Sequence, residues 1–183
     1  MTKVSEIFKE INSKNIVNKN MKPSEFVSKA YSYYLKTYGS NNSLNGSVFE
    51  EIVIRVLLNN EIKPVYAQCK MSFVPNVIFD IVLYNEKMPI SLSLKTSIRE
   101  RWKQADLEAV ALKYIYRNAK CFLASNSTNE IAVRKREENS YLGLDSFVDI
   151  NSSEFDELVE YLKTMDYEEN KSIPVFTSFK EYK

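Results

Sequence analysis

Two stretches, Val77-Ile78-Phe79-Asp80-Ile81-Val82-Leu83 and Ile90-Ser91-Leu92-Ser93-Leu94-Lys95, decide the fold of this chain. Each is a short run of β-branched and apolar residues, and the turn residues Asn85-Glu86-Lys87 separate them, a pattern that predicts two neighbouring strands. In the second run one face of the strand carries Ile90, Leu92 and Leu94, and the other carries Ser91, Ser93 and Lys95. We therefore expect Lys95 to project beside Ser93 and to lie near Asp80.

The rest of the chain predicts helices and strands around this pair. Helical spacing covers residues 4–16, 23–38, 47–60, 101–118 and 152–165, and strand-like runs cover 65–73, 77–84, 90–96, 121–124 and 147–150. Residues 39–46 are rich in turn residues and predict a surface loop that could also touch DNA. Ser47 with Glu50 fits a capping box at the start of the next helix. We expect an α/β fold with a central mixed sheet flanked by helices.

Length and composition narrow the class of protein. The 183 residues are about one domain's length, and 44% hydrophobic with 27% charged residues is typical of a globular chain, so we expect a single domain over residues 1–183. The absence of histidine excludes histidine-ligated zinc, Ser-His triads and histidine general bases. Oxygen ligands would hold any metal, which favours magnesium, manganese or calcium. The net charge of +1 supplies no bulk attraction to DNA.

The sequence predicts a cytoplasmic protein without a membrane partner. No apolar run approaches the roughly 20 residues of a membrane-spanning helix. The polar start Met1-Thr2-Lys3-Val4-Ser5-Glu6 has no signal-peptide core. Cys69 and Cys121 could form one disulfide, but two cysteines in such a chain are more often reduced and buried.

Carboxylates in apolar surroundings are the first candidates for chemistry. Asp80 is embedded in an apolar strand, where burying a charge without a partner is costly. Either Asp80 has a functional role, or it lies at a bend of the strand or pairs with a lysine. Glu108 shares a helix face with the apolar residues Ala105, Ala109, Leu112 and Ile115, which would point its carboxylate inward. The alternative is that Glu108 lies at the edge of this face and forms a surface ion pair. With Ser93 and Lys95 nearby, the two carboxylates could hold a magnesium ion against a phosphate while the lysine positions a water.

Asp80, Ser93-Leu94-Lys95 and Glu108 together resemble the PD-(D/E)xK motif of type II restriction endonucleases. The likeness is to the variant in which serine replaces the acidic residue before the lysine, and a glutamate on the next helix, here 13 residues after Lys95, supplies the missing carboxylate. This arrangement is similar to that of the enzymes that read CCGG and CCNGG-type sites. The resemblance covers residues 46–125 and implies a PD-(D/E)xK restriction-endonuclease-like fold, with Asp80 and Glu108 as Mg²⁺ ligands and Ser93 and Lys95 in the catalytic site.

Arg99-Glu100-Arg101 follows the lysine closely, where enzymes of this group carry their recognition motif. In such enzymes the arginines donate to guanine and the acidic residue accepts from cytosine, as the major-groove pattern allows. The resemblance therefore implies a GC-containing site of the CCGG, CCNGG or GCNGC type. The alternative is an exposed helix start with local ion pairs of little energetic weight. Trp102 is either a packing anchor or a base-stacking residue.

Gly46-Ser47-Val48-Phe49-Glu50 is similar to the Gly-x-x-x-Glu helix start of many nucleases in this superfamily. The glutamate of that motif can join the metal site, so the resemblance adds Glu50 to the catalytic candidates.

As a whole, the sequence predicts a type II restriction endonuclease that hydrolyses double-stranded DNA with Mg²⁺ and leaves 5′-phosphate ends. A palindromic site implies a homodimer, because two active sites must cut two antiparallel strands. Two alternatives remain open. One is a structure-specific or repair nuclease of the same superfamily, and the other is a non-catalytic DNA-binding module in which the carboxylates are structural.

Overall fold

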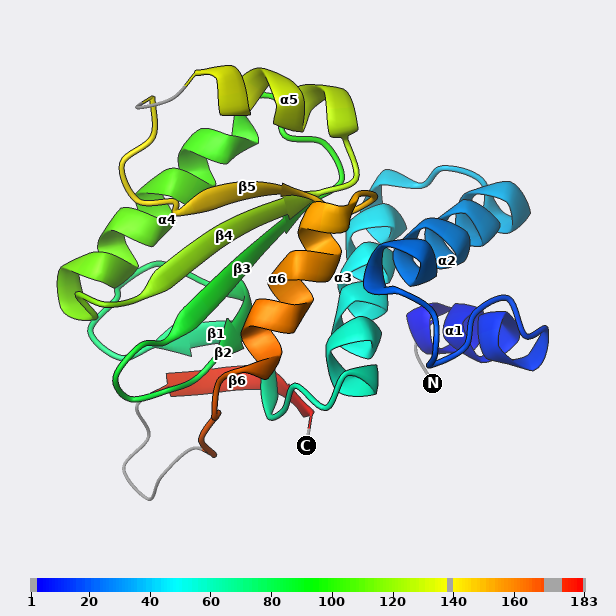
Figure 1. Cartoon of the computed structure of the whole chain (residues 1–183), viewed down its shortest axis with the longest axis horizontal. Coiled ribbons are helices and arrows are strands. Elements are labelled where there is room, and N and C mark those ends of the chain that lie inside the picture. Colours follow the sequence, from blue (N-terminus) through cyan, green and yellow to red (C-terminus); the bar gives the residue numbers. More distant parts are fainter. Residues whose placement is uncertain (1–2, 138–139, 170–175, 183) are drawn as a thin grey trace.

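A six-stranded sheet runs through the centre of the computed structural model, which describes residues 3–137, 140–169 and 176–182 (Figure 1). The strands lie in the order β5-β4-β3-β2-β1-β6. Along the chain they are β1 (Val65–Met71), β2 (Phe79–Leu83), β3 (Ile90–Lys95), β4 (Lys120–Ser125), β5 (Ser146–Asp149) and β6 (Phe176–Tyr182). The strands that carry Asp80 and Lys95 are therefore the two in the middle of the sheet.

The sheet is mixed, because β6, β1, β2 and β3 pair antiparallel whereas β3, β4 and β5 pair parallel. The β2–β3 pairing sets Ile81 opposite Leu92, and the β3–β4 pairing sets Lys95 opposite Ser125. Parallel neighbours need a crossover connection, which helix α4 (Arg101–Ile115) supplies between β3 and β4. Since β2 and β3 run in opposite directions, the start of β2 lies beside the end of β3, at the same end of the strands.

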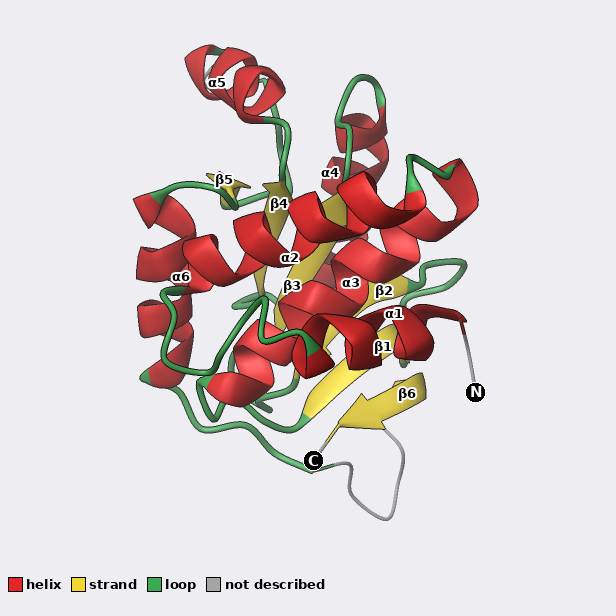
Figure 2. Cartoon of the chain, turned by 90° about the vertical axis from the view of Figure 1, so that its right-hand side faces the viewer, coloured by secondary structure: helices red, strands yellow, loops and turns green. Residues whose placement is uncertain are grey.

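Helices cover both faces of the sheet (Figure 2). One face packs against α3 (Asn42–Asn59) and α6 (Ser153–Lys163), on which α1 (Lys3–Ser13) and α2 (Pro23–Tyr38) lie, and the other face packs against α4 and α5 (Thr128–Arg136). Among the described residues, none of these helices has both the length and the apolar character needed to cross a membrane. The predicted α/β fold with a central mixed sheet flanked by helices is confirmed.

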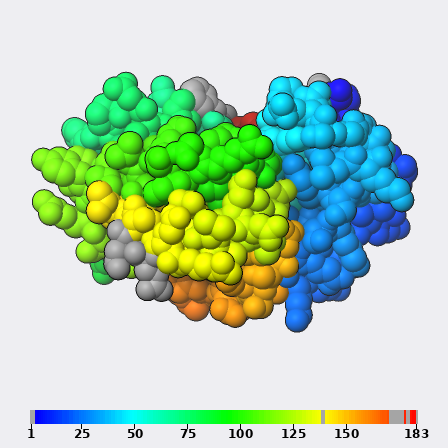
Figure 3. Space-filling model, turned by 90° about the horizontal axis from the view of Figure 1, so that it is seen from above, coloured from blue at the N-terminus to red at the C-terminus, as the bar shows by residue number. Residues whose placement is uncertain are grey.

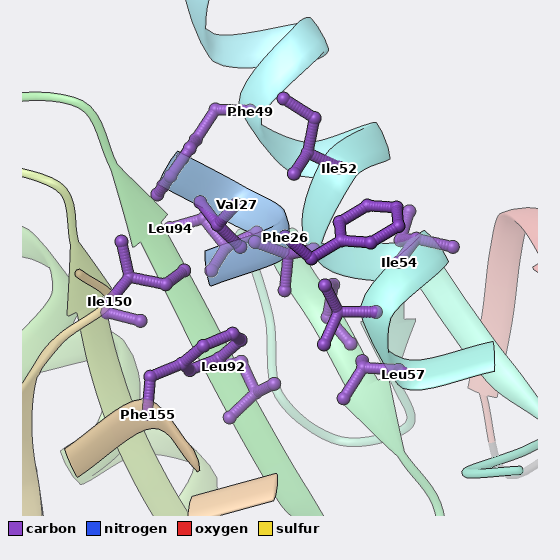
Figure 4. Close-up of a cluster of buried hydrophobic side chains, with 14 of the residues drawn as sticks. Phe26, Val27, Phe49, Ile52, Ile54, Leu57, Leu92, Leu94, Ile150 and Phe155 are labelled. Carbon is purple, nitrogen blue, oxygen red and sulfur yellow. The ribbon is translucent and has the colours of Figure 1, made fainter. Parts of the chain in front are cut away.

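The larger hydrophobic core lies between the sheet and the first of these helical layers (Figure 4). Phe49 and Ile52 of α3, Leu92 of β3 and Phe155 of α6 are almost fully buried in it. Burying one such side chain stabilises the fold by about 1.5–3 kcal/mol relative to leaving it in water. Because these residues come from distant parts of the chain, the core fixes β3, and with it the strand end that carries Lys95.

On the opposite face, a buried carboxylate ties α4 to the loop before β5. Asp106 accepts hydrogen bonds from the backbone N–H groups of Leu142, Gly143 and Leu144 at 2.7 to 3.0 Å. The loop passes so close that a Cβ added at Gly143 would lie 2.4 Å from the carbonyl oxygen of Asp106 and from the backbone nitrogen of Val110. Only glycine fits this approach without moving the helix.

The two cysteines are buried and form no disulfide, so the reduced, buried state that the sequence favours is confirmed. Burial raises the pKa of the Cys69 thiol to about 12 and that of Cys121 to about 11. Neither sulfur is therefore ionised at neutral pH.

The predicted loop over residues 39–46 is largely wrong, and so is the capping box formed by Ser47 and Glu50. Helix α3 begins at Asn42, and its N-cap is Asn41, whose side chain accepts a hydrogen bond from the backbone N–H of Ser43 at 3.0 Å. A strong N-cap offsets the low helix propensity of Gly46, which lies inside the helix with open space beside it. Glu50 therefore lies in the third turn rather than at the helix start.

Neither α5 nor β6 was predicted from the sequence. Helix α5 has a weak apolar pattern, and Ile131 is its one buried residue. Strand β6 pairs with β1 at the end of the sheet, with Ala67 opposite Lys180 and Tyr66 opposite Glu181. Charged residues on an edge strand weaken the apolar alternation by which strands are identified.

Candidate active site

Asp80 and Lys95 form an ion pair at one end of the sheet. Asp80 is the second residue of β2 and Lys95 is the last residue of β3, so the antiparallel pairing brings them to the same end of the sheet. The Lys95 ammonium nitrogen lies 2.8 Å from Oδ2 of Asp80. The side chain of Lys95 is 8% exposed and that of Asp80 is 22% exposed, so this pair is largely shielded from water.

The carboxylate of Asp80 is oriented by three hydrogen bonds that all reach Oδ2. The backbone N–H of Leu94 donates at 2.7 Å, Lys95 donates at 2.8 Å, and the hydroxyl of Ser93 lies at 3.4 Å. Among the described residues no hydrogen bond reaches Oδ1 of Asp80. This oxygen is therefore available to a cation, while Oδ2 is held in place.

Glu108 of α4 faces the same site across a small hollow. The hollow has a volume of about 10 Å³, and its polar lining consists of Asp80, Ser91, Ser93 and Glu108. A volume of this size accommodates roughly one water. Gln104 donates a hydrogen bond to Glu108 at 2.7 Å.

The charges of the pair reach Glu108 although no hydrogen bond joins them. Burial raises the pKa of the Glu108 carboxyl and the negative charge of Asp80 raises it further, while Gln104 and the positive charge of Lys95 act against this rise. Glu108 is thus an inward-facing carboxylate rather than a member of a surface ion pair. Of the apolar positions predicted to share its helix face, Ala105, Ala109 and Leu112 are buried, whereas Ile115 is 37% exposed.

Glu50 lies close enough to Asp80 for their charges to interact. Burial and the charge of Asp80 raise the pKa of Glu50 to about 7. The amide nitrogen of Gln68 donates to the Glu50 carboxylate at 2.8 Å. Gln68 has a φ of 51° inside β1, while the register with β2 is the same before and after it, and its amide reaches Glu50 of α3. The structure thus brings Asp80, Ser93, Lys95 and Glu108 together, with Glu50 beside them.

The donor set fits a magnesium ion that keeps part of its water shell. Within the described ranges no group of three or more histidine, cysteine, aspartate or glutamate side chains is placed to hold a metal ion. Mg²⁺ in phosphate-handling sites commonly uses one or two carboxylates and takes its remaining ligands from water and the substrate. Oδ1 of Asp80 and the carboxylate of Glu108 can supply these two protein ligands.

Arg99, Glu100 and Arg101 are exposed where α4 begins, and they do not join the carboxylate cluster. Glu100 forms an ion pair with Lys103, and the hydrogen bond from Lys103 lowers the pKa of the Glu100 carboxyl. This is the local pairing that the alternative interpretation expects. All three side chains nevertheless face solvent and are free to turn toward a ligand.

Trp102 is a packing residue, which confirms the first of the two interpretations. Its ring is buried, lies 6.3 Å from the ring of Phe147, and is covered by the guanidinium of Arg134 at 5.3 Å. The ring therefore has no open face for a nucleic-acid base.

The candidate residues lie at the end of the molecule that Figure 3 shows from above. The green residues that follow β3 and the yellow-green residues of α5 lie side by side there. The surface is hollowed between the teal hairpin that joins β1 to β2 and the cyan start of α3.

Two polar residues with contacts at this end were not singled out in the sequence. Gln68 holds Glu50, and its one signal is an amide between the apolar residues Ala67 and Cys69 of β1. Glu130 of α5 accepts hydrogen bonds from the segment that follows β3. Glu130 gives no signal in the sequence, because its partners lie more than 30 residues earlier in the chain.

Comparison with known proteins places the fold. No protein-family model matches the chain, and no curated protein sequence does. The structure is similar to the restriction endonuclease PspGI in complex with substrate DNA, with 17% identity over 89% of this chain and 80% of that one and a TM-score of 0.50. It is also similar to the type IIP restriction endonuclease Kpn2I, with 12% identity over 87% of this chain and 69% of that one and a TM-score of 0.52. The chain has the fold of the type II restriction endonucleases.

Proposed function

We propose that this chain is a type II restriction endonuclease, which hydrolyses double-stranded DNA at a short GC-containing site with Mg²⁺. The observation that carries the proposal is the Asp80–Lys95 pair at the end of two central strands, with Glu108 across a water-sized hollow. A buried lysine beside two carboxylates is what phosphodiester hydrolysis needs, and this set lies in a fold shared with enzymes that perform it.

In the proposed mechanism Asp80 and Glu108 would hold the Mg²⁺ ion, which when bound would stabilise the charge that develops on the phosphate and make the attacking water more acidic. Lys95 has three N–H donors, of which one binds Asp80, so the others can orient the attacking water and contact the phosphate. Asp80 holds the ammonium of Lys95 in the site. Ser93 donates to Asp80 and steadies its carboxylate, and Glu50 is proposed as a further acidic group beside the ion. Attack of water on phosphorus breaks the bond to the 3′ oxygen and leaves a 5′-phosphate and a 3′-hydroxyl.

Arg99, Glu100 and Arg101 are proposed to read the bases. An arginine can bridge O6 and N7 of guanine, and a glutamate can accept from N4 of cytosine. Glu100 would exchange its exposed pairing with Lys103 for the base, at small cost because exposed ion pairs contribute little. These contacts are compatible with sites of the CCGG, CCNGG and GCNGC type.

A homodimer is proposed because a two-fold symmetric site presents two strands to be cut. The surface proposed for the second copy is the exposed apolar face of α4, where Leu107 is 66% and Tyr114 75% exposed, with Leu142 beside it at 83%. Exposed apolar patches of this kind are typical of protein interfaces. Helix α4 also carries Glu108 and begins at the reading segment, so pairing of two such helices would place two reading segments near one axis.

The test is digestion of a plasmid of known sequence by the purified chain in Mg²⁺, followed by sequencing of the fragment ends. We expect discrete fragments whose 5′-phosphate ends share one short GC-containing sequence, and no cutting when the metal is chelated. Ends without a shared sequence would instead identify a structure-specific or repair nuclease. If cutting does not exceed that of an Asp80→Asn control, the chain is a non-catalytic DNA-binding module.

A further inference from the structure

Helix α5 holds the segment between β3 and α4 through one carboxylate. Oε2 of Glu130 accepts a hydrogen bond from the backbone N–H of Ile98 at 2.5 Å and lies 3.4 Å from the backbone nitrogen of Arg99. The hydroxyl of Ser97 lies 3.4 Å from each Glu130 oxygen. Three successive residues, immediately before Glu100, are thus bound to one side chain of a remote helix.

The backbone of this segment requires such support. Arg99 has a φ of 35°, in the left-handed region that residues with side chains rarely adopt. Successive N–H groups around a left-handed residue form a concave site for an anion. The carboxylate of Glu130 fills this site, so it stabilises the unusual backbone conformation of Arg99.

Helix α5 also contacts the segment on its other side. The guanidinium of Arg134, one turn after Glu130, covers the ring of Trp102 at 5.3 Å. Ile98 and Trp102 are buried in the same hydrophobic cluster as Ile131 of α5. The exposed residues Arg99, Glu100 and Arg101 therefore lie between two anchored neighbours.

Glu130 stays ionised in this position. Partial burial acts to raise the pKa of its carboxyl, but the hydrogen bonds from the backbone of Ile98 and Arg99 and from Ser127 and Ser97 outweigh burial, so the pKa lies below its ordinary value. A charged acceptor forms stronger hydrogen bonds than a neutral one.

We infer that Glu130 is a positioning residue for sequence reading, which fixes the direction of Arg99 and Arg101 through the backbone N–H groups of Ile98 and Arg99. This inference rests on the proposed function. It assigns to α5 a role in selecting the site, without contact between Glu130 and DNA. The chemistry of strand cutting belongs to the separate cluster around Asp80.

The test compares the wild-type chain with Glu130→Gln, which keeps the size of the side chain but removes its charge. The matched control is Asp156→Asn, which weakens a carboxylate that accepts from the backbone N–H of Ser24 at 2.8 Å and from its hydroxyl at 3.0 Å, between α6 and α2. A plasmid of known sequence is cut in Mg²⁺. The measured quantity is the ratio of the cutting rate at the preferred site to the rate at sites that differ by one base.

We expect this ratio to fall about tenfold in Glu130→Gln, the size of one lost base contact, and to stay at the wild-type value in Asp156→Asn. Thermal unfolding of both variants separates lost stability from lost selectivity. An unchanged ratio in Glu130→Gln overturns the inference, and so does an equal fall in the control. If Glu130→Gln does not unfold cooperatively, Ser97→Ala serves as the second variant, because it removes only the hydroxyl contact with Glu130. We expect the ratio to fall in Ser97→Ala as well, but by less than tenfold.

A double variant tests whether Glu130 acts through Arg99. If it does, adding Glu130→Gln to Arg99→Ala lowers the ratio by less than Glu130→Gln lowers it alone. Fully additive effects overturn the inference. Failure of the proposed function would look different, because the wild-type chain itself would then produce no ends with a shared sequence.

Discussion

The ammonium of Lys95 and the carboxylate of Asp80 are joined at 2.8 Å across two antiparallel strands, with the backbone N–H of Leu94 on the same carboxylate oxygen. The pair compensates two charges that neither strand could bury alone. Among the described residues no hydrogen bond reaches the second oxygen of Asp80, which is the oxygen proposed to bind the cation.

Removing the lysine should cost both stability and activity. Lys95→Met leaves Asp80 as an uncompensated, largely buried charge, so the free energy of unfolding in urea should fall by about 3 kcal/mol. Cutting of the plasmid should fall about a hundredfold to a thousandfold, as when one electrostatic partner of a reacting group is lost. The double variant Asp80→Asn with Lys95→Met should lose less stability than the sum of the single variants. Strict additivity would show that the two groups do not stabilise each other.

Magnesium should stabilise the folded chain through Asp80 and Glu108. At a concentration about a hundred times its dissociation constant, Mg²⁺ should raise the free energy of unfolding by about 2.7 kcal/mol. Asp80→Asn and Glu108→Gln should each remove most of this gain, whereas Glu160→Gln, whose carboxylate pairs with Lys163 on α6, should keep it. Thermal unfolding with and without the metal measures the gain. A full gain in Glu108→Gln would exclude that residue as a ligand.

Glu50 should make the metal-free chain less stable as the pH rises. Its pKa in the folded state is about 7, above its ordinary value of 4.5, so between these pH values the folded chain keeps a proton that the unfolded chain has released. The free energy of unfolding should therefore fall from pH 4.5 to pH 7, by roughly 2 kcal/mol after allowance for the partial exposure of the group. Unfolding across this pH range should show the fall in the wild type and in the exposed control Glu25→Gln. Glu50→Gln should show a smaller fall, because Glu108, whose pKa is also raised, remains in that variant. An unchanged pH dependence in Glu50→Gln would contradict the assignment.

Single substitutions in the reading segment should change the choice of site more than the rate of cutting. Arg99→Ala and Arg101→Ala should each cost about 1–3 kcal/mol of discrimination at one base pair. Lys103→Ala removes the ion-pair partner of Glu100 and should leave the choice of site unchanged. Sequenced fragment ends measure both effects. A uniform fall in cutting at all sites would mean that these arginines contact phosphate rather than bases.

Charge on the outer face of α4 should separate a dimer into single chains. Tyr114→Glu places a carboxylate at a position that is 75% exposed, so the fold should be unaffected while an apolar contact between copies is lost. Sedimentation should show a dimer for the wild type and a monomer for this variant. Lys36→Glu on α2, a charge change at another exposed position, should remain a dimer. A monomeric wild type would exclude this surface as the site of pairing.

The alternation of β3 made the central part of the structure predictable. One face of this strand carries only apolar residues and the other carries only serine and lysine, so the alternation predicts which side chains point toward α4. The short turn at 85–87 predicts that β3 pairs with β2. Helix α2 begins with a proline in its first turn and ends where a glycine follows, and its bounds agree with the prediction. Strong local signals of this kind survive in the folded chain because packing reinforces them.

Contacts between distant residues could not be predicted in the same way. Asn41 caps α3 although the residues after it resemble a loop, since packing of the later turns supports the helix. The contact of Gln68 with Glu50 depends on the left-handed backbone conformation of Gln68 inside β1, and the contact of Glu130 with Ile98 depends on where α5 packs. None of these arrangements has a period or a motif in the sequence. They exist only once the sheet has formed.

The narrow passage at Gly143 has a further consequence for protein engineering. Any other residue there would push its Cβ into the backbone of α4, which carries Glu108 two residues after the anchored Asp106. The distance between the two acidic groups that face each other across the hollow is therefore set in part by a loop that does not line their charged surface. In a library of random variants, position 143 should tolerate almost no replacement, even though no chemistry is assigned to it.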